Sequence, residues 1–206
     1  MNPIERLQAE HSDPAAYAAA YVAHLVEVLR RINPGAVASF IRTLIEARDQ
    51  RKQVFFIGNG GSAATASHFA NDLAIGTRTW DLPFRVTSLT DNVPVMTAIA
   101  NDYSYDEVFL RQLQVLCQPG DVVVAISASG NSPNLLSAVV WANEHGARTV
   151  GLTGFDGGKL ASMVHLNLHV PTDKGEYGPV EDAHMVLDHL VGSFLSGLVA
   201  NRSVST

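Results

Sequence analysis

The chain has 206 residues, of which 14 are basic and 20 acidic, so its net charge is −6 at pH 7. Without a cluster of lysine and arginine, it lacks the electrostatic footprint of a nucleic-acid-binding protein. The single cysteine, Cys117, cannot form an internal disulfide, and neither a signal-peptide pattern nor an uninterrupted membrane span is present. We therefore expect a soluble, cytoplasmic protein that binds a small metabolite, with no nucleic acid and no membrane as partner.

Two helices open the predicted fold. Asp13 caps the first, Pro14 takes its first helical position, and apolar residues recur at helical spacing up to a stop signal at residues 33–35. The second helix is predicted over about 36–47 from its apolar face. Together these helices form a helical N-terminal extension over about residues 13–50.

From residue 54 onward, short apolar runs alternate with helical patterns. Parallel strands need crossover connections, which are usually helices, so the alternation predicts an α/β fold with a mostly parallel sheet covered on both faces. With no repeat or linker, we expect a single domain over residues 1–206 with an α/β core at about 53–200. The predicted strands are 54–57, 84–89, 122–126, 149–152 and 166–170. One predicted helix follows the first strand and ends at about residue 74. The other predicted helices cover 93–100, 105–116, 133–145, 159–163 and 180–200.

Two strand-to-helix turns are rich in glycine and serine. The first is Gly58-Asn-Gly-Gly-Ser62, and the second is Ser127-Ala-Ser-Gly-Asn-Ser132 before Pro133. In open α/β sheets ligands bind beyond the carboxyl ends of the strands, where backbone N–H groups and hydroxyls can surround an anion. Neither turn carries a P-loop lysine, which favours a sugar phosphate or similar monoester over a nucleoside triphosphate.

Two other interpretations of these turns stay open. Either turn alone could be an ordinary connection with capping serines, although two of them in one small domain make that less attractive. The pattern Gly58-x-Gly60-x-x-Ala63 also fits a dinucleotide-binding fingerprint. The acidic residue that such a site needs is missing, because Asp81 precedes the second strand and Asp91 lies well beyond it.

Metal-ligating side chains occur on two predicted helices. His68 and Asp72 are four residues apart, so they share a helix face and could bind a divalent metal, although such a pair is more often a surface hydrogen bond. On the last helix, Asp182 and His189 share a face, whereas Glu181 and His189 are about 80° apart. Spacing alone therefore favours Asp182 over Glu181. That helix offers five titratable side chains: Glu181, Asp182, His184, Asp188 and His189.

Five motifs in chain order resemble the sugar isomerase (SIS) domain, and more closely the phosphoheptose isomerases, over about residues 15–198. They are FIGNGGSAATASHFA at 56–70, AIAND at 98–102, ISASGNS at 126–132, LTGFDGG at 152–158 and EDAH at 181–184. The resemblance implies a flavodoxin-like three-layer sandwich with a five-stranded parallel sheet. It also implies a homotetramer that interconverts sedoheptulose 7-phosphate and D-glycero-D-manno-heptose 7-phosphate through an enediol, with zinc or another divalent metal. The apolar first and last helices would lie between subunits.

The resemblance also implies residue roles. The metal ligands would be His68, Asp72, Glu181 and His189. Asp72 is our candidate base, His189 the acid, and Glu181 a ligand or alternative base, with Asp72 and Glu181 also contacting the substrate. The remaining substrate contacts fall into three groups: Asn59, Gly60, Gly61 and Ser62 along the sugar, Asn101 and Asp102 at its hydroxyls, and Ser127, Ala128, Ser129 and Ser132 at the phosphate.

This chain departs from the family pattern at three of these positions. Asp72 stands where glutamate is usual, Glu181 where glutamine is usual, and Ala128 where threonine is common. Two functional alternatives also remain, because residues 90–93 and 97–102 resemble those of SIS adaptors that bind the replication initiator DnaA, and a sugar-phosphate sensor would share the same pocket. Retention of both histidines and both carboxylates favours the enzyme, because a scaffold has no need of them.

Overall fold

A five-stranded parallel sheet forms the centre of the computed structural model, which describes residues 1–203 and the side chains up to residue 200. The strands lie in the order β2-β1-β3-β4-β5, and all four neighbouring pairs are parallel. This order confirms the predicted flavodoxin-like fold. The strands are β1 (Gln53–Gly58), β2 (Arg85–Ser88), β3 (Val122–Ser127), β4 (Arg148–Thr153) and β5 (Leu166–His169).

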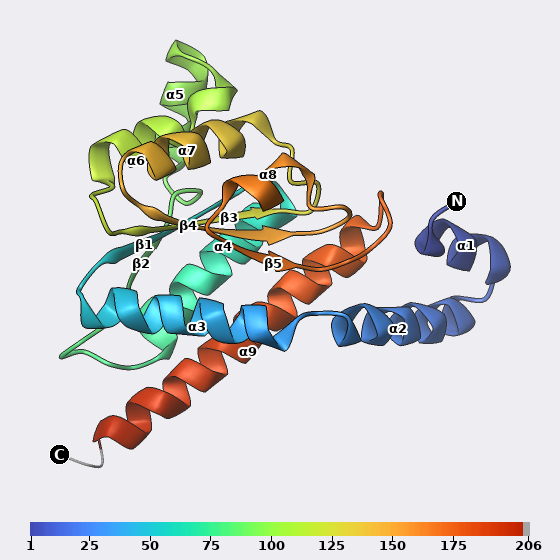
Figure 1. The fold of residues 1–206 in the computed structure, drawn as a ribbon. Coiled ribbons are helices and arrows are strands. Elements are labelled where there is room, and N and C mark those ends of the chain that lie inside the picture. The colour runs from blue at the N-terminus through green and yellow to red at the C-terminus, as the bar shows by residue number, and fades with distance from the viewer. Residues whose placement is uncertain (204–206) are drawn as a thin grey trace.

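Helices cover both faces of the sheet and make it the middle of three layers (Figure 1). On one face lie α3 (Pro34–Asp49), α4 (Gly61–Asn71) and α9 (Tyr177–Ser203), and on the other α6 (Leu110–Leu116), α7 (Pro133–Glu144) and α8 (Gly158–Met163). Each face has its own apolar core. On the α4 side, Phe69 stacks on Phe56 at 4.9 Å between ring centroids and meets the edge of Phe40 at 6.1 Å. These contacts anchor α4 to the sheet.

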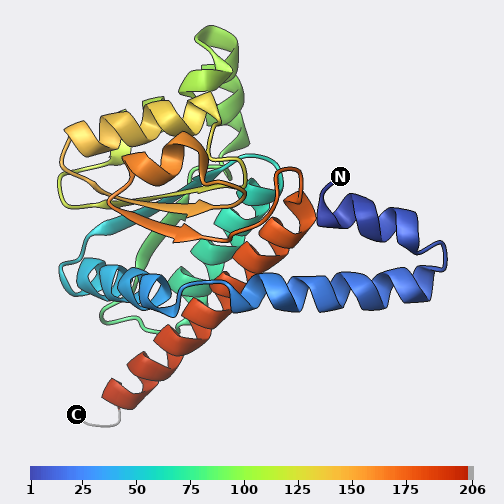
Figure 2. The same cartoon turned by 45° about the vertical axis from the view of Figure 1, so that its right-hand side comes forward.

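Two parts of the chain project from this body. The helices α1 (Pro3–Glu10) and α2 (Pro14–Arg30) extend to one side, and α5 (Val93–Asp102) rises from the opposite face (Figure 2). Neither α1 nor α5 buries any residue, and α2 buries only Val28. Helix α1 was not predicted, although Asn2 and Glu5 form a reciprocal capping box around Pro3. By contrast α3 packs on the sheet, so the segment that stands away from the body ends with α2.

Most predicted boundaries lie within one or two residues of the observed ones, but three elements differ by more. The helix expected over 105–116 is split into a 3₁₀ turn η2 (Tyr105–Glu107) and α6, and α4 passes into a π-helical turn η1 (Asp72–Gly76). Helix α9 begins at Tyr177, three residues earlier than expected. By length and composition its residues Tyr177–Ala200 could cross a membrane. One side of α9, however, is buried in the core through Val180, Leu187, Val191 and Leu195, as in the core helix of a globular domain.

Candidate active site

The two glycine- and serine-rich turns meet where the strand order reverses. Gly58 at the end of β1 pairs with Ile126 in β3, and β2 and β4 lie on opposite outer sides of these two strands. Helix α4 follows β1 and α7 follows β3. In doubly wound sheets the crevice at such a switch point is where ligands bind. The fold therefore brings together the two turns that the sequence singled out.

A cavity of about 190 Å³ opens between the two turns. Gly60 and Ser132 are the N-cap residues of α4 and α7, and neither helix has a side-chain cap. The N–H groups of Gly61 and Ser62 in α4 and of Asn134 in α7 therefore remain available to an anion. Gly60 has a φ of +54°, a conformation that side chains rarely adopt. The cavity is lined by Asn59, Ser62, Ile126, Ser127, Ala128, Ser129, Ser132, Leu135, Tyr177 and Glu181.

Asn59 ties the first turn to α7, the helix that follows the second turn. Its side-chain amide exchanges two hydrogen bonds of 2.9 Å with the amide of the buried Asn134 in α7. The Tyr105 hydroxyl donates to the Asn59 Oδ1 at 2.9 Å. Asn59 therefore fixes the shape of the cavity wall in addition to facing its interior.

The structure distinguishes Glu181 from Asp182. The Glu181 carboxylate lies against Gly61, so close that a Cβ at Gly61 would be 2.5 Å from its Cδ. Asp182 points elsewhere and accepts a 2.6 Å hydrogen bond from the Tyr21 hydroxyl of α2. Glu181 is thus the carboxylate that faces the cavity, as the family resemblance implied and spacing alone did not. Burial, and then the charge of Asp182, raise the pKa of Glu181.

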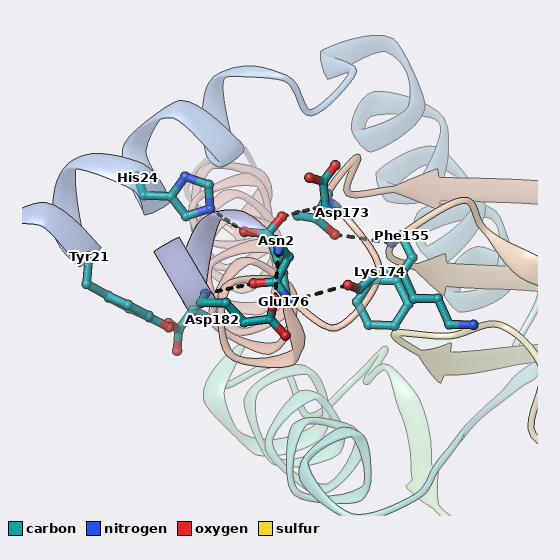
Figure 3. A network of polar contacts seen from close by, with 10 residues as sticks. Asn2, Tyr21, His24, Phe155, Asp173, Lys174, Glu176 and Asp182 are labelled. Atoms are coloured by element: carbon teal, nitrogen blue, oxygen red, sulfur yellow. Dashed lines mark hydrogen bonds and ion pairs between the residues drawn. The ribbon is translucent and has the colours of Figure 1, made fainter. Parts of the chain in front are cut away.

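Polar contacts from α2 and α1 fix the turn that leads into α9 (Figure 3). Glu176 is almost fully buried, and its Oε1 lies 2.6 Å from the His24 Nε2 while its Oε2 accepts from the Asp173 N–H at 2.7 Å. Asn2 donates to the Lys174 carbonyl at 3.4 Å. Tyr177, which directly follows Glu176 in the chain, lines the cavity. Tyr177 was not among the predicted site residues, because its predicted place in a polar loop gave no sign of its position.

A second cluster lies further along α4 and α9. Its members are His68 and Asp72 from α4 and the turn after it, and Asp188 and His189 from α9, with one possible ligand atom from each within 4.8 Å of the others. The His68 and His189 Nε2 atoms are 3.3 Å apart, and the His68 Nε2 lies 3.6 Å from the Asp72 Oδ2. Because α4 enters a π turn at Asp72, this aspartate stands at an irregularity typical of functional sites.

Asp188 is the unexpected member of this cluster. It is fully buried, and neither of its carboxylate oxygens has a hydrogen-bond partner among the described residues. Burial, and then the charge of Asp72, raise the pKa of Asp188 to about 7. The sequence offered Asp188 as one of five titratable residues on the last helix, but helical spacing gave no reason to choose it.

Three predicted site residues lie outside the group of residues to which they were assigned. Glu181 does not belong to the cluster of histidines and aspartates, because it lies at the Gly61 end of α4. Asn101 and Asp102 are exposed at the end of α5, where the Asn101 amide donates to the Asp102 Oδ1 at 2.8 Å, and neither lines the cavity.

The chain is similar to known proteins over most of its length. A family model described as SIS domain matches residues 16–154. A phosphoheptose isomerase of Geobacter sulfurreducens is 38% identical over 167 residues, which are 81% of this chain and 87% of that protein. The solved phosphoheptose isomerase of Neisseria gonorrhoeae has a TM-score of 0.79 at 31% identity, over 87% of this chain and 97% of that one. The enzyme of Francisella tularensis has a TM-score of 0.80 at 25% identity, over 90% and 99%.

Proposed function

Because the chain belongs to the phosphoheptose isomerase family of SIS-domain proteins, we propose that it interconverts sedoheptulose 7-phosphate and D-glycero-D-manno-heptose 7-phosphate. One observation carries the proposal. The cavity with two uncapped helix N-termini and the cluster of histidines and aspartates lie along the same two helices, α4 and α9. An isomerase of this kind needs an anion site for the phosphate and titratable groups beside the reacting carbons at the far end of the sugar.

The phosphate is assigned to the turn after β3. Ser127, Ser129 and Ser132 offer hydroxyls, and Ala128 offers its backbone N–H. The Ser127 Oγ already accepts from the Gly130 N–H at 3.0 Å, so its proton is free for a phosphate oxygen. The positive ends of α4 and α7 supply the remaining attraction, which explains how a chain of net charge −6 binds an anion. Asn59, Gly60, Gly61 and Ser62 would line the sugar beside it.

Proton transfer is assigned to Asp72 and His189. The Asp72 carboxylate would accept the proton from the carbon beside the carbonyl, while His189 gives a proton to the carbonyl oxygen as the enediol forms. Asp72 would then return its proton to the former carbonyl carbon, while His189 takes back a proton from the other hydroxyl as the new carbonyl forms. His68 lies seven residues beyond Gly61, about 10 Å along α4. That separation supports the proposal, because the reacting carbons and the phosphate lie at opposite ends of the sugar. Glu181, which lines the cavity beside Gly61, is the alternative base.

The histidine and aspartate cluster suits a divalent metal, since two imidazoles and two carboxylates are good ligands for zinc. The Nε2 separation of 3.3 Å between His68 and His189 supports this, because two ligands each about 2.0–2.1 Å from a tetrahedral zinc lie about 3.4 Å apart. His68, Asp72 and His189 would hold the ion. The chemistry that such an ion supplies is polarisation of the carbonyl and adjacent hydroxyl.

We also propose that the protein is a cytoplasmic homotetramer. Apolar side chains are exposed on helices of the predicted subunit interface, and such a patch is typical of an interaction surface. They are Val22 and Val26 on α2 and Val186, Leu190 and Phe194 on α9.

Incubation with sedoheptulose 7-phosphate tests the enzyme assignment. We expect the aldose product by nuclear magnetic resonance, loss of turnover after chelation, and recovery when zinc is restored. Full activity of the metal-free protein would exclude a catalytic metal. Heptose phosphate binding without turnover would instead indicate a sensor, and capture of DnaA without turnover would indicate an adaptor.

A further inference from the structure

Burying a carboxylate without a hydrogen bond costs free energy of folding. Asp188 has such a carboxylate. Its side chain is 0% exposed, and within the described part of the chain neither oxygen has a hydrogen-bond partner. The His68 Nε2 is 3.9 Å from the Asp188 Oδ2, which is beyond hydrogen-bond distance. Buried charges in proteins are normally paired or bound to metal. An apolar residue at this position of α9 would be buried without that cost. The presence of Asp188 therefore indicates that its carboxylate binds a partner.

The surroundings of Asp188 identify the partner as a cation. Ligand atoms of His68, Asp72 and His189 lie within 4.8 Å of one another and of an Asp188 oxygen. Each of the four side chains has a nitrogen or oxygen atom that can bind a metal ion. The separations of 3.3, 3.6 and 3.9 Å that involve the His68 Nε2 are close to the edge of a zinc tetrahedron, which is about 3.4 Å.

Glu181 does not complete this set. Its carboxylate packs on Gly61, which lies seven residues before His68 on α4, a rise of about 10 Å. Asp188 follows Glu181 by seven residues, so it occupies nearly the same face of α9 two turns further on. The carboxylate that reaches the histidines is therefore the later one.

We propose that Asp188, and not Glu181, is the fourth ligand of a divalent metal held by His68, Asp72 and His189. The proposal deepens the proposed function, because it rests on the metal site assigned there. Two carboxylates neutralise the double charge of the ion, and the buried Asp188 needs no desolvation when the ion binds. Glu181 is left free at the cavity, where it can contact the substrate.

Metal affinity, not activity, tests this assignment. The full-length protein, stripped of metal, is titrated with cobalt and with zinc against a chromophoric chelator, as the wild type and as Asp188→Asn, Asp188→Ala and Glu181→Gln. Asp182→Asn is the matched control, because it makes the same carboxylate-to-amide change on α9 at a side chain bonded to Tyr21. Circular dichroism of each metal-free variant reports folding separately.

We expect both Asp188 variants to bind at least about 100-fold more weakly, and their cobalt complexes to lose the intense visible bands of a four-coordinate site. Glu181→Gln and Asp182→Asn should bind within about twofold of the wild type. Wild-type affinity in a folded Asp188→Asn protein would overturn the proposal, as would a large loss in Glu181→Gln, or failure of the wild type to bind either ion. A wild type that binds metal through Asp188 but turns over no sedoheptulose 7-phosphate would refute the proposed function alone.

Discussion

A methyl group at Gly61 would act directly on Glu181. The Cβ of Gly61→Ala would lie 2.5 Å from the Glu181 Cδ and 2.6 Å from its Oε1. Carbon atoms in contact normally lie about 3.5–4.0 Å apart, so the carboxylate must retreat by about 1 Å or more. It is the far end of a flexible side chain, and it can swing away while the backbone stays in place.

The effect on stability should therefore be small and the effect on catalysis large. Displacing the carboxylate costs about 0.5–1.5 kcal/mol in side-chain conformation, and alanine recovers up to about 1 kcal/mol over glycine in a helix. The free energy of unfolding should thus change by less than about 1 kcal/mol. A 1 Å misplacement that arises away from the reacting atoms can cost about 100-fold in rate. Because Glu181 contacts the substrate in the proposed complex, this is the loss of kcat/KM that we expect.

The assay compares kcat/KM on sedoheptulose 7-phosphate with the thermal unfolding of each variant. Gly197→Ala is the control, because Gly197 is an exposed glycine of α9 whose added Cβ would meet no atom within 4 Å. A double-mutant cycle with Glu181→Ala isolates the coupling. Once Glu181 is removed, Gly61→Ala should cost little more.

Two results would refute this reasoning. Near-wild-type kcat/KM in Gly61→Ala would mean that the position of the Glu181 carboxylate does not matter to the reaction. Losses that multiply in the double variant would mean that Gly61 acts through another contact.

Three further predictions concern other groups. Asp72→Asn should lower turnover far more than tenfold with the fold intact, because it removes the proposed base; steady-state kinetics that remain near wild type would exclude that role. His24→Ala should lower the free energy of unfolding by about 2–3 kcal/mol, because it leaves the buried Glu176 carboxylate short of a partner; urea denaturation measures this, and an unchanged midpoint contradicts it. Burial lowers the pKa of His184 to about 4, and the Thr153 backbone opposes the shift only in part. As the pH falls, the histidine is protonated in the unfolded chain before it is protonated in the folded one. The free energy of unfolding of the wild type should therefore decrease relative to that of His184→Gln as the pH falls from about 6.5 to 4, by at most about 3 kcal/mol. A pH-independent difference would refute this.

The sheet could be predicted from sequence because its signal is local. Five short apolar runs separated by helical patterns allow few arrangements once crossovers are required. The turns at 58–62 and 127–132 follow two of those runs, so their meeting at the switch point follows from topology. Helix α1 was missed because it buries nothing, and only the capping box at Asn2 and Glu5 marks it.

The two carboxylates on α9 show where this kind of prediction stops. Helical periodicity compares residues on one ideal helix, and it favoured Asp182 because that residue shares a face with His189. Which carboxylate turns inward depends instead on contacts distant in sequence: Tyr21 binds Asp182, and Gly61 leaves room for Glu181. The burial of Asp188 likewise depends on how α4 packs against α9. The spacing of residues within one helix does not predict any of these contacts.

The parallel course of α4 and α9 has a consequence for selectivity. Glu181 meets Gly61 near the start of the pair, and Asp188 and His189 meet His68 and Asp72 about two turns later. For a phosphate at the proposed position beside the switch point, the rise of about 1.5 Å per residue sets how long a carbon chain must be to bring its carbonyl to Asp72, the proposed base. The spacing along the two helices thus selects for chain length, because the carbonyl of a sugar phosphate with fewer carbons does not reach Asp72. Choice among sugar phosphates can then reside in backbone geometry, with little need to read each hydroxyl.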